Sequence, residues 1–235
     1  MGIVAKGRSQ ARKAAEILGP KIPVKAHSHR SSSIVQLQLS DLTIVRRRTF
    51  IDNVALARRG GRVQGDLVEC GTWRGGMSAA MAWAVPGRHS VLFDSFEGLP
   101  DPKPIDGSRA IRWFEDESTE HRKLQAAEAS AVEAMERAGQ SDFEIVKGWF
   151  EDTVPGWAEK KRPIAVLRLD ADWYDSTILC LEQLWPLVSP GGVVIVDDYY
   201  TWDGCSRAVH DYLSRTQAEE RLEWSSHGVV YVVRR

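Results

Sequence analysis

The stretch that most constrains the fold is 164–198, IAVLRLDADWYDSTILCLEQLWPLVSPGGVVIVDD. Its two apolar runs, 164–169 and 193–196, are short and rich in β-branched residues, which is typical of buried strands. Between them, residues 174–188 carry apolar side chains at helical spacing and end at a Ser-Pro-Gly-Gly stop signal. A strand-helix-strand unit needs a crossover connection, so we expect parallel strands whose carboxyl ends share one edge of the sheet.

Acidic residues follow both strands of this unit. Asp170 and Asp172 come after the first strand, and Asp197 and Asp198 come after the second. Open α/β sheets bind ligands at this edge, and four carboxylates gathered there would repel each other unless a cation neutralised them. Oxygen ligands favour magnesium, calcium or manganese. The alternative is that these aspartates cap the following helices, although caps rarely come as two closely spaced pairs.

Composition narrows the class of protein. With 235 residues, 43% of them hydrophobic, we expect one sizeable core and one domain. The 31 basic and 32 acidic residues are mixed and create no positive field, which argues against a nucleic-acid partner. Three widely spaced cysteines indicate neither a disulfide framework nor a zinc site, and no apolar run of about 18 residues is present. We therefore expect a cytoplasmic protein without a membrane span.

The expected domain order is an N-terminal arm or cap over 1–40 and an α/β domain over 41–235. The arm is basic and contains one short helical candidate, 11–18. The domain begins with an amphipathic helix, 41–59, and continues as a doubly wound, mostly parallel, seven-stranded sheet. Its expected strands are 66–71, 90–94, 143–146, 164–169, 193–196, 221–226 and 229–233, of which the last two form a C-terminal antiparallel hairpin.

The turn after the first strand is rich in glycine but is no dinucleotide fingerprint. Gly71, Gly75 and Gly76 give G-x-x-x-G-G rather than G-x-G-x-x-G. Glu69, just before the turn, would crowd a pyrophosphate but could hold the ammonium group of an amino acid. Asp94 ends the second strand roughly 20 residues later, where such folds place the acid that binds ribose hydroxyls.

Two further segments border the same edge. Residues 96–113 form a proline-broken loop, longer than most connections, which we expect to serve as a lid or substrate wall before a charged helix at 119–138. Trp149 and Phe150 follow the third strand. Either ring could stack on an aromatic base, although an aromatic residue beside a strand is more often part of the core.

Five motifs, taken in order, resemble those of a known family. They are DLVECGTWRGG (66–76), FDSFEGLP (93–100), VKGWFEDTVP (146–155), LRLDADWYDST (167–177) and GGVVIVDDY (191–199). Together they resemble class I S-adenosylmethionine-dependent methyltransferases of Rossmann-like fold, and within them the macrocin O-methyltransferase type. The resemblance extends over nearly all of residues 41–235.

The resemblance implies a set of site residues. It implies S-adenosylmethionine at the first three motifs, magnesium held by Asp170, Asp197 and Asp198, and Asp172 as the candidate catalytic base. We take the cofactor-binding residues to be Glu69, Gly71, Thr72, Asp94, Ser95, Gly148, Trp149, Phe150 and Asp170. The implied acceptor is a small-molecule hydroxyl, usually on a sugar of a glycosylated natural product. As partners we expect this acceptor and further copies of the chain in a homo-oligomer, but neither nucleic acid nor a membrane.

The chemistry of methyl transfer agrees with these residue types. An alcohol is too weakly acidic to ionise near neutral pH, and a cation chelated by two adjacent hydroxyls lowers the acceptor's pKa and fixes its orientation. A side chain then removes the proton. Asp172 and His210 are the two candidates. We favour Asp172 because it lies two residues from a proposed metal ligand, whereas His210 has the better intrinsic pKa.

Two other classes of function remain open from the residues. A metal-dependent phosphoryl-transfer or hydrolytic enzyme would also cluster aspartates at a sheet edge, but the phosphate-binding pattern G-x-x-x-x-G-K-[ST] is absent from the sequence. A non-catalytic nucleotide-binding module would explain the glycine turn and Asp94, yet it would leave four edge aspartates without a purpose.

Overall fold

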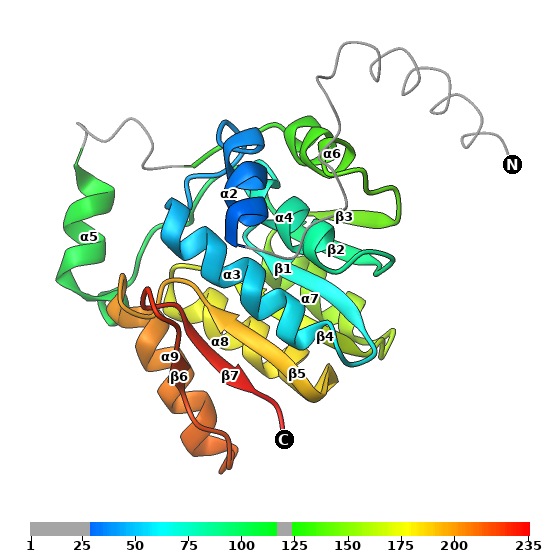
Figure 1. Ribbon diagram of the computed structural model, residues 1–235. Helices are drawn as coiled ribbons and strands as arrows, with labels where there is room; N and C mark the ends of the chain where they lie inside the picture. The colour runs from blue at the N-terminus through cyan, green and yellow to red at the C-terminus, as the bar shows by residue number, and fades with distance from the viewer. Residues whose placement is uncertain (1–28, 117–123) are drawn as a thin grey trace, which may run out of the picture.

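The computed structural model describes residues 29–116 and 124–235 and shows a seven-stranded sheet between two layers of helices (Figure 1). The strand order is β3-β2-β1-β4-β5-β7-β6. The pairs within β3-β2-β1-β4-β5 are parallel, and β7 is antiparallel to both β5 and β6, so the predicted fold class is confirmed. The strands are β1 (Asp66–Cys70), β2 (Ser90–Asp94), β3 (Phe143–Lys147), β4 (Ile164–Leu169), β5 (Val188–Val196), β6 (Glu223–Trp224) and β7 (Val230–Val233).

Alternation along the strands produces two cores, one on each face of the sheet. Val166 and Ile195 point into the first core, and their neighbours Leu167 and Val196 point into the second. The first core is covered by α2 (His29–Gln38), α3 (Arg47–Gly60), α4 (Gly76–Ala84) and α6 (Glu128–Arg137). The second is covered by α5 (Gly107–Glu115), α7 (Phe150–Ala158), α8 (Tyr174–Leu184) and α9 (Asp203–Arg215). Figure 1 shows α3 and α8 on opposite faces of the sheet.

The central strand-helix-strand unit is confirmed, with one correction to its second strand. A short 3-10 helix, η2 (Trp185–Leu187), ends α8, and β5 then starts at Val188 rather than at 193. The segment 189–192, predicted to be a helix stop, continues the strand across a register irregularity, and Gly191 and Gly192 bond to the backbone of Arg234. The Pro-Gly-Gly run is therefore a bulge within a strand.

Three predicted element boundaries are wrong. The helix expected at 41–59 begins only at Arg47, because the preceding turn is held against α4 by a bond from Gly76 N to Leu42 O (2.9 Å). The loop expected at 96–113 becomes helical from η1 (Pro104–Asp106) through α5. The helix expected at 119–138 begins at Glu128, and residues 117–123 lie outside the described part of the chain.

Besides α5, two helices were not predicted. Pro155 lies inside α7 and removes one helical hydrogen bond, which disguises a helix whose Val154 and Trp157 are buried. The described part of the expected arm forms α2, whose Val35 and the following Leu39 pack into the first core. The rest of the arm, including the candidate helix at 11–18, lies outside the described residues. The domain boundary at residue 40 stays a prediction.

Two composition-based expectations can be compared with the structure. None of the helices in the described ranges has the length and apolarity that a membrane crossing requires. Cys70, Cys180 and Cys205 are all buried and free, as expected of a chain without a disulfide framework.

Candidate active site

A cavity of about 650 Å³ lies at the carboxyl ends of the parallel strands. Residues that follow β1, β2, β4 and β5 line it, and the 42–46 turn, the start of α3 and the β6–β7 turn close its sides. The lining includes Glu69, Asp94, Asp170, Asp172, Asp197 and Asp198. Strands β1, β2, β4 and β5 therefore deliver acidic residues to one cavity, and the crossover argument predicted this for the four aspartates that follow β4 and β5.

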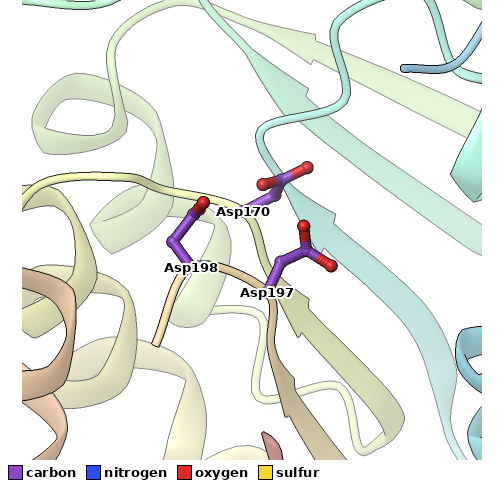
Figure 2. A group of neighbouring side chains, drawn as sticks. All are labelled: Asp170, Asp197 and Asp198. Atoms are coloured by element: carbon purple, nitrogen blue, oxygen red, sulfur yellow. The ribbon is translucent and has the colours of Figure 1, made fainter. Parts of the chain in front are cut away.

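Three of these carboxylates form a compact group. Each of Asp170, Asp197 and Asp198 offers one oxygen, and these oxygens all lie within 4.8 Å of one another. Figure 2 shows the three side chains on the loops that follow β4 and β5, around a common space. Hard carboxylate oxygens at this spacing, from a site open to a water-filled cavity, match the ligand set that magnesium, calcium or manganese prefers.

The alternative that the aspartates cap helices does not hold. The N-cap residue of α8 is Trp173 and that of α9 is Trp202, and neither helix has a side-chain capping bond. The aspartates lie before these caps and point into the cavity.

A buried arginine, Arg168, supplies a positive charge that the sequence reasoning missed. It is 0% exposed, and its Nη1 contacts Glu69 and lies 2.8 Å from Asp170 Oδ2, while its Nη2 lies 2.7 Å from Asp197 Oδ1. Its Nε donates to Asn53 Oδ1 on α3 (3.1 Å). The sequence contained a signal for this ion pair, because a charged residue within the apolar run IAVLRL can be buried only if it is paired.

The pKa values around Arg168 reflect burial opposed by this charge. Burial raises the pKa of Glu69 to about 7, although Arg168 and the hydroxyl of Ser78 favour its ionised form. Burial also raises the pKa of Asp197 against the lowering effect of Arg168. For Arg168 itself, burial would lower the pKa, but the surrounding carboxylates outweigh this and hold the guanidinium charged.

No arginine within residues 29–116 and 124–235 pairs with Asp172 or Asp198. Burial, together with the charge of Asp170, raises the pKa of Asp172 to about 8, and burial together with the charge of Asp172 raises the pKa of Asp198 well above its ordinary value. Trp202 Nε1 donates to Asp172 Oδ1 (2.9 Å), and the backbone N–H of Asp172 donates to Asp198 Oδ2 (3.3 Å). These two carboxylates therefore carry the uncompensated negative charge of the site.

The backbone at Asp172 is not extended, although Asp172 follows directly after a strand and its connection. Its φ of 54° lies in the left-handed region, which aspartate tolerates better than most residues. Asp172 still lines the cavity, because this turn and the bond from Trp202 fix its carboxylate. Trp202 is in turn packed against Trp173, with ring centroids 5.1 Å apart.

The expected cofactor residues of the first two strands form two hydrogen-bonded groups. Ser78 donates to Glu69, and Thr72 Oγ1 lies 3.1 Å from the Ser78 hydroxyl. Asp94 accepts from the backbone N–H groups of Trp73 and Phe96, both at 2.6 Å, and so links the turns after β1 and β2. Burial raises its pKa despite these bonds.

Gly71 is required by the close approach of the β1 and β4 ends. Its φ is +89°, and a Cβ at this position would lie 1.9 Å from the carbonyl oxygen of Asp170. Any side chain here would separate the turn after β1 from the carboxylate cluster.

The remaining cofactor candidates line a second, smaller cavity of about 50 Å³. Ser95, Gly148, Trp149 and Phe150 border it, together with Gly71, Asp94 and Asp170, which the two cavities share. The structure thus brings all nine candidates to two cavities that share lining residues. One of the nine, Asp170, is also a candidate metal ligand.

His210 lies elsewhere. It is exposed on α9, where its Nε2 lies 2.8 Å from the Tyr199 hydroxyl, and it lines neither cavity. The two candidate bases are therefore separated, and only Asp172 shares the cavity with the carboxylate cluster.

Solved structures with this architecture identify the class of protein. The chain is similar to the O-methyltransferase NovP, with 30% identity, 82% of each chain covered and a TM-score of 0.68. The calicheamicin methyltransferase CalS11 has the same fold, with a TM-score of 0.67 over 99% of this chain and 94% of that one at 21% identity. The fold is that of the class I methyltransferases.

Sequence comparison identifies the family. The profile described as Macrocin-O-methyltransferase (TylF) matches residues 42–234, so the chain belongs to the macrocin O-methyltransferase family. A tetracenomycin 4'-O-methyltransferase from Streptomyces olivaceus that acts on a dimethoxy-rhamnosyl compound is 42% identical, over 65% of this chain and 59% of that protein. Mycinamicin III 3''-O-methyltransferase from Micromonospora griseorubida is 34% identical, over 72% and 68%. The match thus spans just under two thirds of the first relative's length.

Proposed function

We propose that the chain transfers a methyl group from S-adenosylmethionine to a hydroxyl of a glycosylated small molecule, with a divalent cation, magnesium by preference, at Asp170, Asp197 and Asp198. One observation carries the proposal: the carboxylate cluster, Asp172 and the candidate cofactor residues line two cavities that share Gly71, Asp94 and Asp170. Methyl transfer needs donor, acceptor and base within reach of one another.

The cofactor half of the cavity is formed by β1 and β2. S-adenosylmethionine supplies a methyl group on a positively charged sulfur when bound. Glu69 and Asp94 offer carboxylates for its amino and ribose groups, and the smaller cavity beside Trp149 and Phe150 suits its adenine ring. Asp94 keeps free acceptor capacity, because each oxygen of its carboxylate has a second lone pair.

The metal half is formed by β4 and β5. A bound cation supplies Lewis-acid polarisation of the acceptor oxygens. Arg168 holds Asp170 and Asp197 in place from behind, so that their remaining oxygen atoms face the cavity beside Asp198. Asp198 brings a charge that no arginine balances, which favours cation binding at this position.

We assign the proton transfer to Asp172 rather than to His210. Asp172 Oδ1 accepts the bond from Trp202, which leaves Oδ2 to accept the proton of the acceptor hydroxyl. The methyl group then forms its bond to that oxygen as its bond to sulfur breaks, and the proton stays on Asp172 until solvent takes it. Without a cation, burial and the charge of Asp170 raise the pKa of Asp172 to about 8, and the charge of a bound cation would lower this pKa and favour the ionised form that accepts a proton near neutral pH.

The acceptor class comes from the relatives. The Streptomyces olivaceus protein methylates the 4' position of a rhamnosyl compound, and the Streptomyces niveus relative is a demethyldecarbamoylnovobiocin O-methyltransferase, 36% identical over 69% of this chain. By analogy with these acceptors, we propose a sugar hydroxyl of a glycosylated natural product as the group methylated here.

The test separates cofactor, metal and turnover. Calorimetry should detect S-adenosylmethionine binding with and without magnesium, because the metal belongs to the acceptor side. Chelation should abolish methylation of a rhamnoside, and added magnesium should restore it. Full activity after confirmed metal removal would contradict the metal assignment, and no binding of S-adenosylmethionine in either condition would contradict the whole proposal.

A further inference from the structure

The turn between β6 and β7 forms one wall of the large cavity through His227, Gly228 and Val229. This turn reaches the active-site edge because β7 is antiparallel to β5, so the start of β7 lies beside the end of β5. Val196↔Val230 is the last residue pair between β5 and β7. Counting two residues further along each strand from this pair places Gly228 opposite Asp198. The sequence reasoning treated this segment only as a hairpin turn.

A carboxylate from α3 holds the turn and its histidine. Asp52 Oδ2 accepts the Ser225 hydroxyl and the backbone N–H of His227 (2.9 Å), and Asp52 Oδ1 lies 3.1 Å from His227 Nδ1. Burial would raise the pKa of Asp52, but these hydrogen bonds outweigh it and hold the pKa below the ordinary value. The Asp52 side chain is 10% exposed, whereas that of His227 is 37% exposed. A fixed carboxylate therefore orients a ring that faces open space.

The orientation of the ring decides what its free nitrogen can bind. An ionised Asp52 can only accept, so Nδ1 carries the hydrogen, and in the neutral ring Nε2 is then a hydrogen-bond acceptor. No contact of Nε2 with a polar group of the described residues forms in the structure. A ligand with O–H donors would satisfy this nitrogen, as a polyhydroxylated acceptor does.

The position of His227 in the sheet places it on the acceptor side. In the strand order, β4 and β5 lie between β7 and the strands β1 and β2 that carry Glu69 and Asp94. Adjacent strands are about 4.8 Å apart, so the β6–β7 turn lies one strand from Asp198 but three strands, roughly 14 Å, from the end of β1.

We propose that His227, oriented by Asp52, is an acceptor-binding residue whose Nε2 accepts a hydrogen bond from an acceptor hydroxyl other than the one methylated. This assignment rests on the proposed function, since it assumes a hydroxylated acceptor in the metal half of the cavity. His227 then fixes the orientation of the acceptor and selects for hydroxyl groups at that distance from the reacting oxygen.

A competing explanation is that Asp52 and His227 only fasten the hairpin. The bonds from Ser225 and from the backbone N–H of residue 227 survive any substitution of the His227 side chain. His227→Phe therefore keeps most of the fastening and the ring volume but removes both nitrogens. Ser225→Ala is the matched control, because it removes a fastening bond without changing a residue that lines the cavity.

The experiment measures methyl transfer to methyl α-L-rhamnopyranoside, S-adenosylmethionine binding and the unfolding midpoint in the wild type and both variants. For His227→Phe we expect the KM for the rhamnoside to rise about 5-fold or more, the scale of one lost hydrogen bond. kcat, cofactor affinity and the unfolding midpoint should change little. Ser225→Ala should keep the KM of the wild type.

The outcomes separate this inference from the proposed function. An unchanged KM in His227→Phe, or an equal rise in Ser225→Ala, overturns the role of His227 while the proposed function stands. If the wild type binds S-adenosylmethionine but methylates no rhamnoside, the proposed acceptor class fails, and the assignment of His227 fails with it.

Discussion

The carboxylates of the cavity fall into two groups that differ in how their charge is balanced. Glu69, Asp170 and Asp197 surround the guanidinium of Arg168, a residue that is itself fully buried. Asp172 and Asp198 lie on the cavity side of this arrangement, and among the described residues their side-chain partners include no cation.

The difference between the two groups explains how a fold can tolerate these five carboxylates beside Asp94 in one place. The first group shares the charge of Arg168 within the protein, so it can be fixed and buried without a ligand. The second group has no such partner among the described residues, so only a proton or a cation from solvent can neutralise it, and burial together with the neighbouring carboxylate charges raises its pKa values. The carboxylates around Arg168 thus stabilise the fold, and the neighbouring carboxylates of the second group are available for binding and chemistry.

The largest expected effect is the loss of the internal cation. Arg168→Met should lower the free energy of unfolding by about 3–5 kcal/mol, because it leaves buried carboxylates unpaired. Urea denaturation measures this. Arg162→Met is the matched control: Arg162 also pairs with a carboxylate, Asp66 at 2.6 Å, but its side chain is 39% exposed, so its loss should cost less than about 1 kcal/mol. Equal losses would show that Arg168 does not balance the first group.

The next effect concerns turnover and the second group. Asp172→Asn should reduce kcat by roughly 10² or more while keeping cation and cofactor binding, since the amide cannot take the proton. Initial rates with a rhamnoside and calorimetry of both ligands check this. His210→Ala should remain close to the wild type because His210 lies outside the cavity. A near-normal rate in Asp172→Asn with a large loss in His210→Ala would transfer the role of base to the histidine.

A smaller effect is expected at the cofactor half. Asp94→Ala should weaken S-adenosylmethionine binding by about 10-fold, the scale of a lost hydrogen bond to a charged group. Calorimetry measures it, and Asp172→Asn serves as the control that leaves this affinity unchanged. An unaltered affinity in Asp94→Ala would mean that Asp94 does not bind the cofactor and only connects the turns at Trp73 and Phe96.

The order of the central strands and the position of the aspartates at their ends could be predicted because local sequence patterns encode them. Strand-helix-strand periodicity in 164–198 requires a parallel crossover, and this alone brings Asp170 to Asp197 and Asp198. The aspartate positions at strand ends follow from the same argument.

The missed features depend on contacts between distant segments. The position of Asn53 beside Arg168 and of Asp52 beside His227 depends on how α3 packs across the sheet, which no local pattern reports. Arg168 could have been recognised as a buried charge in a strand, but its partners could not have been named. α7 was not predicted because Pro155 interrupts the helical pattern of the sequence. In the structure, the burial of Trp157 against the rest of the protein stabilises the helix despite this proline.

The smallest expected effect is a dependence of stability on pH that belongs to the second group. In the folded chain without a cation the pKa of Asp172 is about 8, well above its ordinary value of 3.8, so between these values the folded state binds a proton that the unfolded state has lost. Stability contributed by this group is therefore complete below pH 4 and is lost as pH rises through 8. In chelator, the unfolding midpoint of the wild type should fall relative to that of Asp172→Asn as the pH rises from about 5.5 to about 8.5. The contribution of Glu69 is common to both proteins and cancels. Magnesium should stabilise the wild type more at pH 8.5 than at pH 5.5, because it replaces the proton as the source of positive charge. Parallel pH profiles of the two proteins would mean that Asp172 is ionised in the fold without a cation, and that the two groups of carboxylates do not differ in the way proposed.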